Sequence, residues 1–203
     1  MQSKTKEMGR RVCVFCGSSP GLRPVYRAEA VALGRLLGEA NLGLVYGGAQ
    51  VGLMGALADA ALAHGSEVIG VIPRVLAGVE VAHQGLNRLV LVETMHERKA
   101  LMAQEADAFV ALAGGFGTLD EFFEILTWAQ LGIHAKPCLL VNTAGYYDHL
   151  LSFLEVAIHQ GFLKAENRDY INVAVDAAEA LQRMQKLWRT LPVSHTPPAK
   201  PAP

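Results

Sequence analysis

One glycine-rich turn combines two kinds of chemistry that oppose each other. The stretch ALAGGFGTLDE (residues 111–121) ends an apolar run, passes three glycines and then reaches Thr118, Asp120 and Glu121. Where such a turn opens a helix, its backbone N–H groups and the helix dipole bind phosphate. Two carboxylates beside the turn would repel the same anion, so their presence needs a separate explanation.

Two explanations for Glu121 are open at this point. If Thr118 is the N-cap of the following helix, Glu121 completes a capping box, and Thr94 and Glu97 have the same spacing. Alternatively, Glu121 acts at an electron-poor centre close to a bound phosphate. When a sugar–base bond breaks, C1′ of the ribose becomes oxocarbenium-like, and a carboxylate can stabilise it and position water.

Two more glycine-rich turns, CGSSPG (16–21) and YGGAQVG (46–52), also follow apolar runs. The first does not match the dinucleotide pattern G-x-G-x-x-G, and the turn at 113–118 lacks the lysine of a Walker A loop. These features disfavour a nicotinamide dehydrogenase or an NTPase and favour a mononucleotide. The stretch ETMHERKALM adds Arg98 and Lys99. Arg98 can grip phosphate with two parallel hydrogen bonds, although a solvated basic pair is the alternative.

Strand and helix patterns alternate along the chain and must position these turns. Strands are expected at 11–16, 42–46, 67–72, 88–93, 108–113, 137–142 and 169–173, and helices at 25–40, 52–65, 95–106, 118–131, 146–160 and 176–191. This alternation predicts a single α/β domain over residues 11–191, with a Rossmann-like, doubly wound parallel sheet covered by helices on both faces. The carboxyl ends of the strands then bring the three turns to one edge. Residues 1–10 and the proline-rich end 192–203 are expected to be disordered.

Composition limits the partners and the chemistry. The chain has 203 residues, 51% of them hydrophobic, and a net charge of -1, which gives no bulk attraction to nucleic acid or membranes. The start lacks the apolar core of a signal peptide and no apolar run reaches the ~18 residues of a spanning helix, so a cytoplasmic location is expected.

Cys13 and Cys16 form a C-x-x-C, but on a strand they point to opposite faces, which favours core packing. The histidines show no metal-ligand spacing, so neither a metal nor another cofactor is expected. Any catalytic activity of the protein should therefore survive chelators.

Several stretches together resemble the Lonely Guy family of phosphoribohydrolases, many of whose members have been labelled lysine decarboxylase. They are VFCGSS, LVYGGAQVGLMG, GVIP, MHERKALM, GGFGTLDE and TWAQLGIHAKP, and the resemblance runs from about residue 11 to residue 165. It implies a Rossmann-like homodimer that hydrolyses nucleoside 5′-monophosphates. The typical substrates are cytokinin riboside 5′-monophosphates, and AMP is also cleaved, in each case to the free base and ribose 5-phosphate.

The resemblance also implies roles for individual residues. Arg98 and Glu121 match the catalytic pair. The residues that match the phosphate loop are Gly114, Gly115, Gly117 and Thr118, and Phe116 between them is expected to contact substrate. Other positions that match substrate contacts or pocket walls are Ser18, Gly48, Glu80, Met95, Lys99 and Thr127.

This chain departs from the family pattern at two positions. Ala113 stands where the family usually has proline, and Ala49 stands where it usually has a third glycine. Losing the proline frees the backbone before the turn. Ala49 would resist a positive φ. Because neither residue touches the matched pair, we expect effects on rate and on the preferred base more than on the reaction.

Two rival functions remain open. A nucleotide-binding module without catalysis would keep the glycine turns but would not need Glu121, and release of adenine from AMP separates it from a hydrolase. A lysine decarboxylase would need pyridoxal phosphate on a lysine, and Lys99 is the lysine near the expected site. An absorbance scan for that cofactor tests the second rival.

Overall fold

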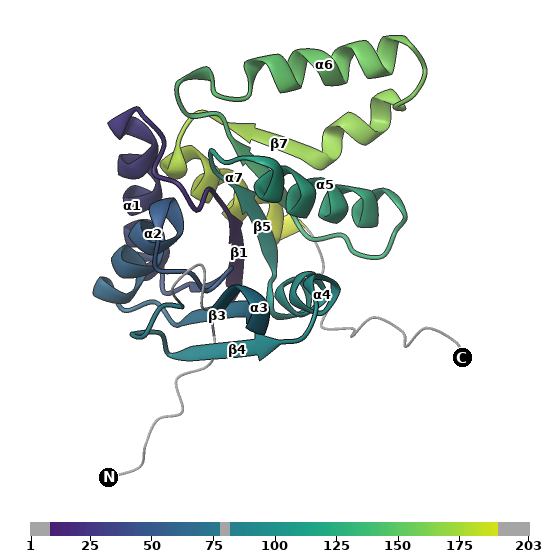
Figure 1. Cartoon of the computed structure of the whole chain (residues 1–203). Helices are drawn as coiled ribbons and strands as arrows, with labels where there is room; N and C mark the ends of the chain where they lie inside the picture. The colour runs from purple at the N-terminus through teal and green to yellow at the C-terminus, as the bar shows by residue number, and fades with distance from the viewer. Residues whose placement is uncertain (1–8, 78–81, 191–203) are drawn as a thin grey trace.

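The computed structural model describes residues 9–77 and 82–190, and its centre is a seven-stranded sheet in the order β4-β3-β2-β1-β5-β6-β7 (Figure 1). Every neighbouring pair of strands is parallel. The strands are β1 Arg11–Phe15, β2 Gly43–Tyr46, β3 Val68–Pro73, β4 Arg88–Val92, β5 Ala108–Ala111, β6 Cys138–Val141 and β7 Ile171–Ala174. The prediction of a Rossmann-like α/β domain is confirmed.

The helices that connect these strands cover both faces of the sheet (Figure 1). They are α1 Pro24–Glu39, α2 Gly52–Ala63, the short α3 Arg74–Ala77, α4 Met95–Glu105, α5 Phe116–Gln130, α6 Asp148–His159 and α7 Ala177–Thr190, with 3₁₀ turns η1 Thr143–Gly145 and η2 Ala165–Tyr170. One apolar core lies between the sheet and α1, α2 and α7. A second lies between the opposite face and α4, α5 and α6. No helix was predicted between the strands at 67–72 and 88–93, where the short α3 lies.

The predicted disordered ends fall almost entirely outside the described residues. Of residues 1–10 the structure describes Gly9 and Arg10, and the Arg10 carbonyl accepts a hydrogen bond from the Gly43 N–H at 2.9 Å. The Arg10 guanidinium lies 4.8 Å from the centre of the Trp188 ring. Residues 192–203 are not described, and none of the helices in the part that is described is long and apolar enough to cross a membrane.

The chain reverses the direction of strand addition at β1. Strands β2, β3 and β4 are added on one side of β1, and the chain then returns to place β5 on the other side. The connections that follow β1 and β5 therefore leave in opposite directions. In open α/β sheets a crevice forms at the carboxyl ends of two such strands, and this is where ligands bind.

The C-x-x-C cysteines belong to opposite faces of the sheet, as predicted. Cys13 packs in the core beneath α4 and α5, and Cys16 packs in the core beneath α1 and α2. Both thiols are free, and burial is the main reason why the pKa of each lies well above its ordinary value. They are packing residues and form no disulfide.

The two expected capping boxes have different outcomes. Thr94 is the N-cap of α4, and its side chain accepts the Glu97 N–H at 3.1 Å, while the Glu97 carboxylate accepts the Glu93 N–H at 2.8 Å. This box is confirmed, with the return bond displaced by one residue. The box expected for α5 is wrong, because that helix begins at Phe116 and Thr118 lies buried within its first turn.

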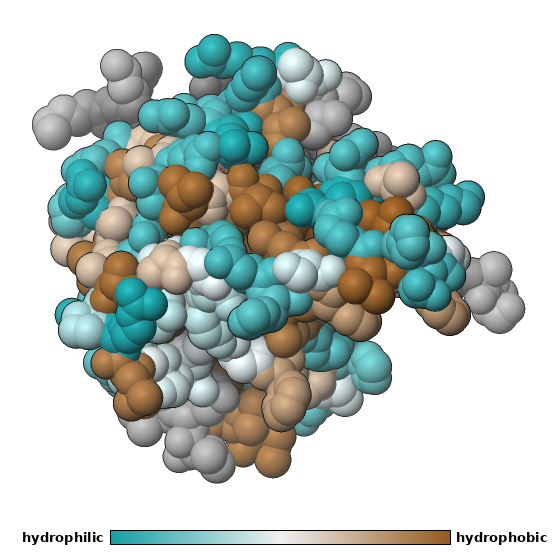
Figure 2. Space-filling view, turned by 90° about the horizontal axis from the view of Figure 1, so that it is seen from above, coloured by the Kyte–Doolittle hydropathy of each residue, from teal (hydrophilic) through white to brown (hydrophobic). Residues whose placement is uncertain are grey.

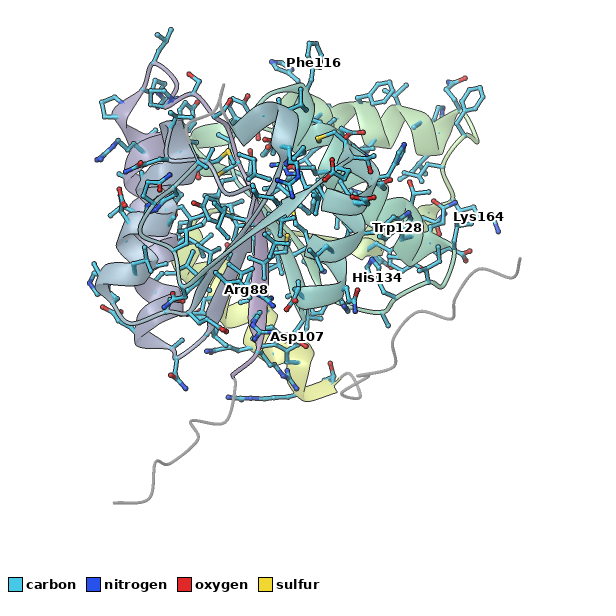
Figure 3. All side chains as sticks on the ribbon, turned by 60° about the horizontal axis from the view of Figure 1, so that its bottom comes forward. Arg88, Asp107, Phe116, Trp128, His134 and Lys164 are labelled. Atoms are coloured by element: carbon cyan, nitrogen blue, oxygen red, sulfur yellow. The ribbon has the colours of Figure 1, made fainter. Side chains whose placement is uncertain are left out.

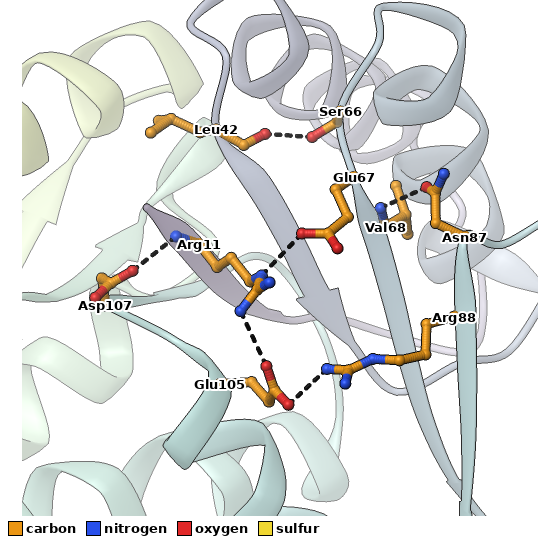
Figure 4. Close-up of polar contacts among 9 residues, drawn as sticks. All are labelled: Arg11, Leu42, Ser66, Glu67, Val68, Asn87, Arg88, Glu105 and Asp107. Carbon is orange, nitrogen blue, oxygen red and sulfur yellow. Dashed lines mark hydrogen bonds and ion pairs between the residues drawn. The ribbon is translucent and has the colours of Figure 1, made fainter. Parts of the chain in front are cut away.

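Charged side chains close the amino edge of the sheet (Figure 4). The Arg11 guanidinium lies 2.9 Å from the carboxylate of Glu67 and 3.0 Å from that of Glu105, which also lies 2.5 Å from Arg88. The Arg11 N–H donates to Asp107 at 2.8 Å. The side chains of Arg11 and Glu105 are only 13% and 20% exposed, so solvent and salt screen these pairs less than ordinary surface pairs. We call these five residues the amino-edge cluster.

Candidate active site

The turns after β1 and β5 are bonded together at the carboxyl edge of the sheet. The Gly17 N–H donates to the Ala113 carbonyl at 3.0 Å. Beside this contact is a cavity of about 210 Å³, at the switch point described above. Phe116 is among its lining residues and lies at the end of the molecule opposite Arg88 and Asp107 (Figure 3).

The cavity brings together most of the residues that the sequence singled out. Arg98 and Glu121 face it from α4 and α5. The other predicted residues that line it are Ser18, Gly115, Phe116, Gly117 and Thr118. Gly114 lies directly behind them, where a Cβ would come 2.0 Å from the Thr118 hydroxyl and 2.9 Å from the Gly17 nitrogen. The close packing of the two turns therefore requires a glycine at position 114.

The glycines at 115 and 117 have a different role from Gly114. A Cβ on either would meet no protein atom within 4 Å, so packing within the chain does not require glycine there. Gly115 is the N-cap of α5, and no side chain caps the helix at this residue. The first N–H groups of α5 therefore open onto the cavity without side chains in front of them, which is the arrangement that binds phosphate at a helix N-terminus.

Arg98 and Glu121 form a buried pair at the inner end of the cavity. Their side chains are 8% and 10% exposed, and the Arg98 Nη2 lies 3.5 Å from the Glu121 Oε1. The Arg98 Nε donates to the Val71 carbonyl at 3.2 Å, and Nη2 donates to the Gly47 carbonyl at 3.5 Å. Backbone carbonyls thus fix the plane of the guanidinium, and the guanidinium holds the carboxylate at the cavity.

Gly47 belongs to the site although it was not among the predicted residues, and its position in the glycine pair Gly47–Gly48 is the sequence signal that could have indicated it. A Cβ at this position would lie 2.1 Å from the Arg98 Nη2 and 2.5 Å from the Met54 Cε. We expect Gly47→Ala to push the guanidinium away from Glu121 and to lower kcat/KM for AMP by about tenfold or more. Steady-state kinetics with a thermal unfolding curve checks this result, and wild-type kinetics in the folded variant would contradict it.

Lys99 does not join the described residues that line the cavity. Its Nζ lies 2.9 Å from the carboxylate of Glu124 and 3.1 Å from that of Asp120, so it ties α4 to α5. Burial lowers the pKa of Lys99, but the two carboxylates outweigh this and raise it above its ordinary value. The two acids of the turn are thereby explained separately: Asp120 pairs with Lys99, and Glu121 faces the cavity.

Two further predicted substrate contacts, Met95 and Thr127, are not among the described residues that line the cavity. Met95 is 39% exposed, and its Sδ accepts a long hydrogen bond from the Arg98 Nη1 at 3.8 Å. Thr127 lies further along α5, exposed, and its hydroxyl donates to the Phe123 carbonyl at 2.8 Å. Glu80 lies outside the described residues. In this chain, then, Met95 contacts Arg98, whereas the hydroxyl of Thr127 is bonded within α5.

The replacement of the family glycine by Ala49 causes no backbone strain. Gly48 has the positive φ of this turn, +79°, and a Cβ there would lie 3.2 Å from Ile72 and 3.3 Å from Leu89. Ala49 is not among the described residues with positive φ and is fully buried. Gly48 therefore shapes the turn from behind the cavity, and the expected resistance of Ala49 does not arise.

Two tyrosines that the sequence did not reveal reach the glycine turn after β5 from the segment after β6. The Tyr146 hydroxyl donates to the Gly114 carbonyl at 2.7 Å, and the Tyr147 hydroxyl donates to the Leu112 carbonyl at 2.6 Å. More than thirty residues separate each tyrosine from its partner, so no local pattern reveals the contact.

Fold and site together define a Rossmann-like protein in which the start of α5 and a buried arginine–glutamate pair line one crevice. The chain belongs to the Lonely Guy family of cytokinin riboside 5′-monophosphate phosphoribohydrolases. The family model described as "Possible lysine decarboxylase" matches residues 54–184.

The curated relatives agree with this assignment, and a solved structure shares the fold. The chain is 45% identical to the cytokinin riboside 5′-monophosphate phosphoribohydrolase LOG2 of Arabidopsis thaliana, covering 90% of this chain and 86% of that protein. It is 47% identical to the cytokinin riboside 5′-monophosphate phosphoribohydrolase of Rhodococcoides fascians, covering 89% and 92%. The Moco carrier protein of Chlamydomonas reinhardtii shares the fold, with a TM-score of 0.68 at 20% identity over 90% of this chain and 99% of that one.

The decarboxylase description does not fit the residues at the site. Lysine decarboxylation needs pyridoxal phosphate on a lysine, and a Schiff base forms from a neutral amine. The Lys99 ammonium is held by two carboxylates that raise its pKa. Burial lowers the pKa of Lys136, but that residue precedes β6 and donates to the Ala103 carbonyl, away from the cavity. Within residues 9–77 and 82–190, no cluster of three or more His, Cys, Asp or Glu could hold a metal ion.

Proposed function

We infer that this chain hydrolyses the N-glycosidic bond of nucleoside 5′-monophosphates, including cytokinin riboside 5′-monophosphates and AMP, to the free base and ribose 5-phosphate. One observation carries the inference: an open helix N-terminus suited to phosphate and the Glu121 carboxylate line the same cavity. The names of the relatives at 45% and 47% identity agree with it. A module that only binds nucleotides would have no use for a buried carboxylate at this point.

The site residues divide the reaction between binding and chemistry. The N–H groups at the start of α5, with Ser18 and Thr118 beside them, bind the 5′-phosphate. Arg98 orients Glu121 and contributes positive charge near the ribose or phosphate. As the bond from C1′ to the base breaks, its electron pair leaves with the base, and Glu121 stabilises the positive charge on C1′.

A water molecule held by the same carboxylate completes the reaction. Glu121 positions a water molecule, whose oxygen bonds to C1′ while one of its protons passes to the carboxylate. The departing base takes up one proton from solvent, and Glu121 gives the proton that it accepted back to solvent, so base and ribose 5-phosphate together account for the nucleotide and one water.

The purified protein incubated with AMP tests the proposal. We expect adenine and ribose 5-phosphate in equal amounts by chromatography, and a panel of 5′-monophosphates then ranks the bases. AMP that binds but remains intact, with every other 5′-monophosphate also uncleaved, would favour the binding module instead.

We also propose that the protein is a homodimer. Most apolar side chains of α5, including Phe122 and Ile125, are covered within the chain, so the exposed apolar residues lie mainly elsewhere. Large apolar residues nevertheless remain exposed after α5 and around α6, namely Leu131, Ile133, Phe153, Val156 and Phe162. Apolar groups bordered by polar ones also appear on the face that Figure 2 shows. Such patches are commonly matched about a two-fold axis.

Light scattering at micromolar concentration measures the oligomeric state. We expect a mass of twice 21.8 kDa or a higher multiple, because exposed apolar groups of this size gain free energy when buried. A mass of 21.8 kDa would contradict the dimer and leave the proposed reaction untouched.

We place the protein in the cytoplasm. The three cysteines are all free and buried, which is the usual condition of cysteines in a reducing compartment.

A further inference from the structure

Every carbonyl oxygen in the segment 112–114, which leads into the phosphate loop, accepts a hydrogen bond from another part of the chain. In chain order the donors are the Tyr147 hydroxyl at 2.6 Å, the Gly17 N–H at 3.0 Å and the Tyr146 hydroxyl at 2.7 Å. Two of the three bonds therefore come from consecutive tyrosines after β6. We call these two residues the tyrosine pair.

These bonds matter because peptide groups have two ends of opposite polarity. A carbonyl oxygen turned into the cavity would repel phosphate, whereas an N–H would attract it. The segment contains Ala113 in place of the family's proline, and Gly114, so its own residues constrain the peptide planes little. Bonds from outside the segment must keep the oxygens away from the anion.

The tyrosine pair is itself held firmly. The backbone turns through Ala144 and Gly145, both with positive φ, at 52° and 74°, and the Tyr147 N–H donates to the Asn142 side chain at 2.7 Å. The Tyr147 ring is buried, and Tyr146 packs edge-on against it at 4.8 Å between ring centres. Burial raises the pKa of Tyr147 well above its ordinary value, so its hydroxyl stays protonated and continues to donate.

We propose that Tyr146 and Tyr147 are positioning residues, which set the affinity for the 5′-phosphate by holding the carbonyls of residues 112–114 away from it. The proposal rests on the proposed function of the crevice. It predicts an effect on phosphate recognition that a purely structural role would not produce.

The test removes one hydroxyl at a time and keeps each ring, in Tyr146→Phe and Tyr147→Phe. Tyr26→Phe is the matched control, because Tyr26 packs edge-on against Tyr146 at 5.4 Å while its hydroxyl holds no carbonyl of the segment 112–114. Calorimetry measures the Kd of ribose 5-phosphate, and kinetics measures kcat/KM for AMP and for adenosine.

Each variant of the pair should weaken ribose 5-phosphate binding by about three- to tenfold, the value of one hydrogen bond. The KM for AMP should rise with it, while kcat/KM for adenosine, which has no phosphate, stays at the wild-type value. The Tyr26→Phe protein should match wild type in all three measurements. Tyr146 is 42% exposed and its ring borders a neighbouring cavity of about 560 Å³, so Tyr146→Phe decides the question if the buried variant folds poorly.

A lower melting temperature with an unchanged Kd for ribose 5-phosphate would overturn the proposal, and so would equal losses for AMP and adenosine. The binding measurement does not depend on catalysis. If wild type binds ribose 5-phosphate but releases no adenine, the proposed function fails and the tyrosine pair is still tested. If wild type does not bind ribose 5-phosphate, the tyrosine proposal fails too.

Discussion

The Glu121→Gln protein should fold, bind AMP and lose about 100-fold or more in kcat. Glutamine fills the same volume but carries no charge to stabilise the C1′ cation or to take a proton from water. Because α5 begins at Phe116, Glu121 is not a cap, and its loss affects stability through its buried partner Arg98. We expect a cost of about 1–3 kcal/mol in the free energy of unfolding, since Arg98 keeps its two backbone acceptors.

The neighbouring acid supplies the control. Asp120→Asn changes the same charge one residue earlier, on a side chain that is 60% exposed and pairs with Lys99. Its kcat should stay close to the wild-type value, because Glu124 still holds Lys99. Urea unfolding, AMP binding by calorimetry and adenine release separate stability from chemistry. Near wild-type turnover in Glu121→Gln, or an equal loss in Asp120→Asn, would remove Glu121 from the mechanism.

Removing the 5′-phosphate from the substrate should have an effect of similar size. We expect kcat/KM for adenosine to be lower than for AMP by about 100-fold or more. The start of α5, which lines the cavity, is the proposed site of this group, and binding energy gained there would support the reaction at C1′. Parallel kinetics with both substrates measures the ratio.

A variant of the loop itself checks that the phosphate lies at the start of α5. Gly115→Ala adds a methyl group that meets no protein atom within 4 Å, so the fold should be unaffected. The methyl group should raise the KM for AMP without changing adenosine turnover. Comparable kcat/KM for AMP and adenosine in wild type would mean that this turn serves another purpose.

The overall fold could be predicted from the sequence because strands and helices alternate and each strand is bounded by a turn. The start of α5 could not be predicted in the same way. Gly115 and Gly117 are poor helix formers, and Thr118 with Glu121 fits a capping box, so local preferences place the helix start too late. In the folded chain Thr118 is instead packed against Gly114, and the helix extends back through Gly117 to Phe116.

Sheet topology predicts which residues gather at the site, and helix geometry explains why Lys99 is not among them. Parallel strands end at one edge, so Arg98, Glu121 and the glycine turn had to lie near each other. Lys99 follows Arg98 on the same helix, and successive side chains on a helix point about 100° apart, so the two cannot share one role. The hydroxyls of Tyr146 and Tyr147 reach backbone atoms distant in sequence, which residue patterns do not encode.

The amino-edge cluster separates the residues that stabilise the sheet from those that could change substrate specificity. Its ion pairs link β1, α4 and β4 at the end of the sheet remote from the crevice. Met95 and Phe116 stand at the opposite end, partly or almost fully exposed, with little of the core depending on them. Under the proposed function Met95 matches a substrate contact and Phe116 lines the cavity, so substitutions at these two positions would change the site while the scaffold stays intact. A library meant to change specificity would randomise the mouth of the cavity and leave the amino edge untouched.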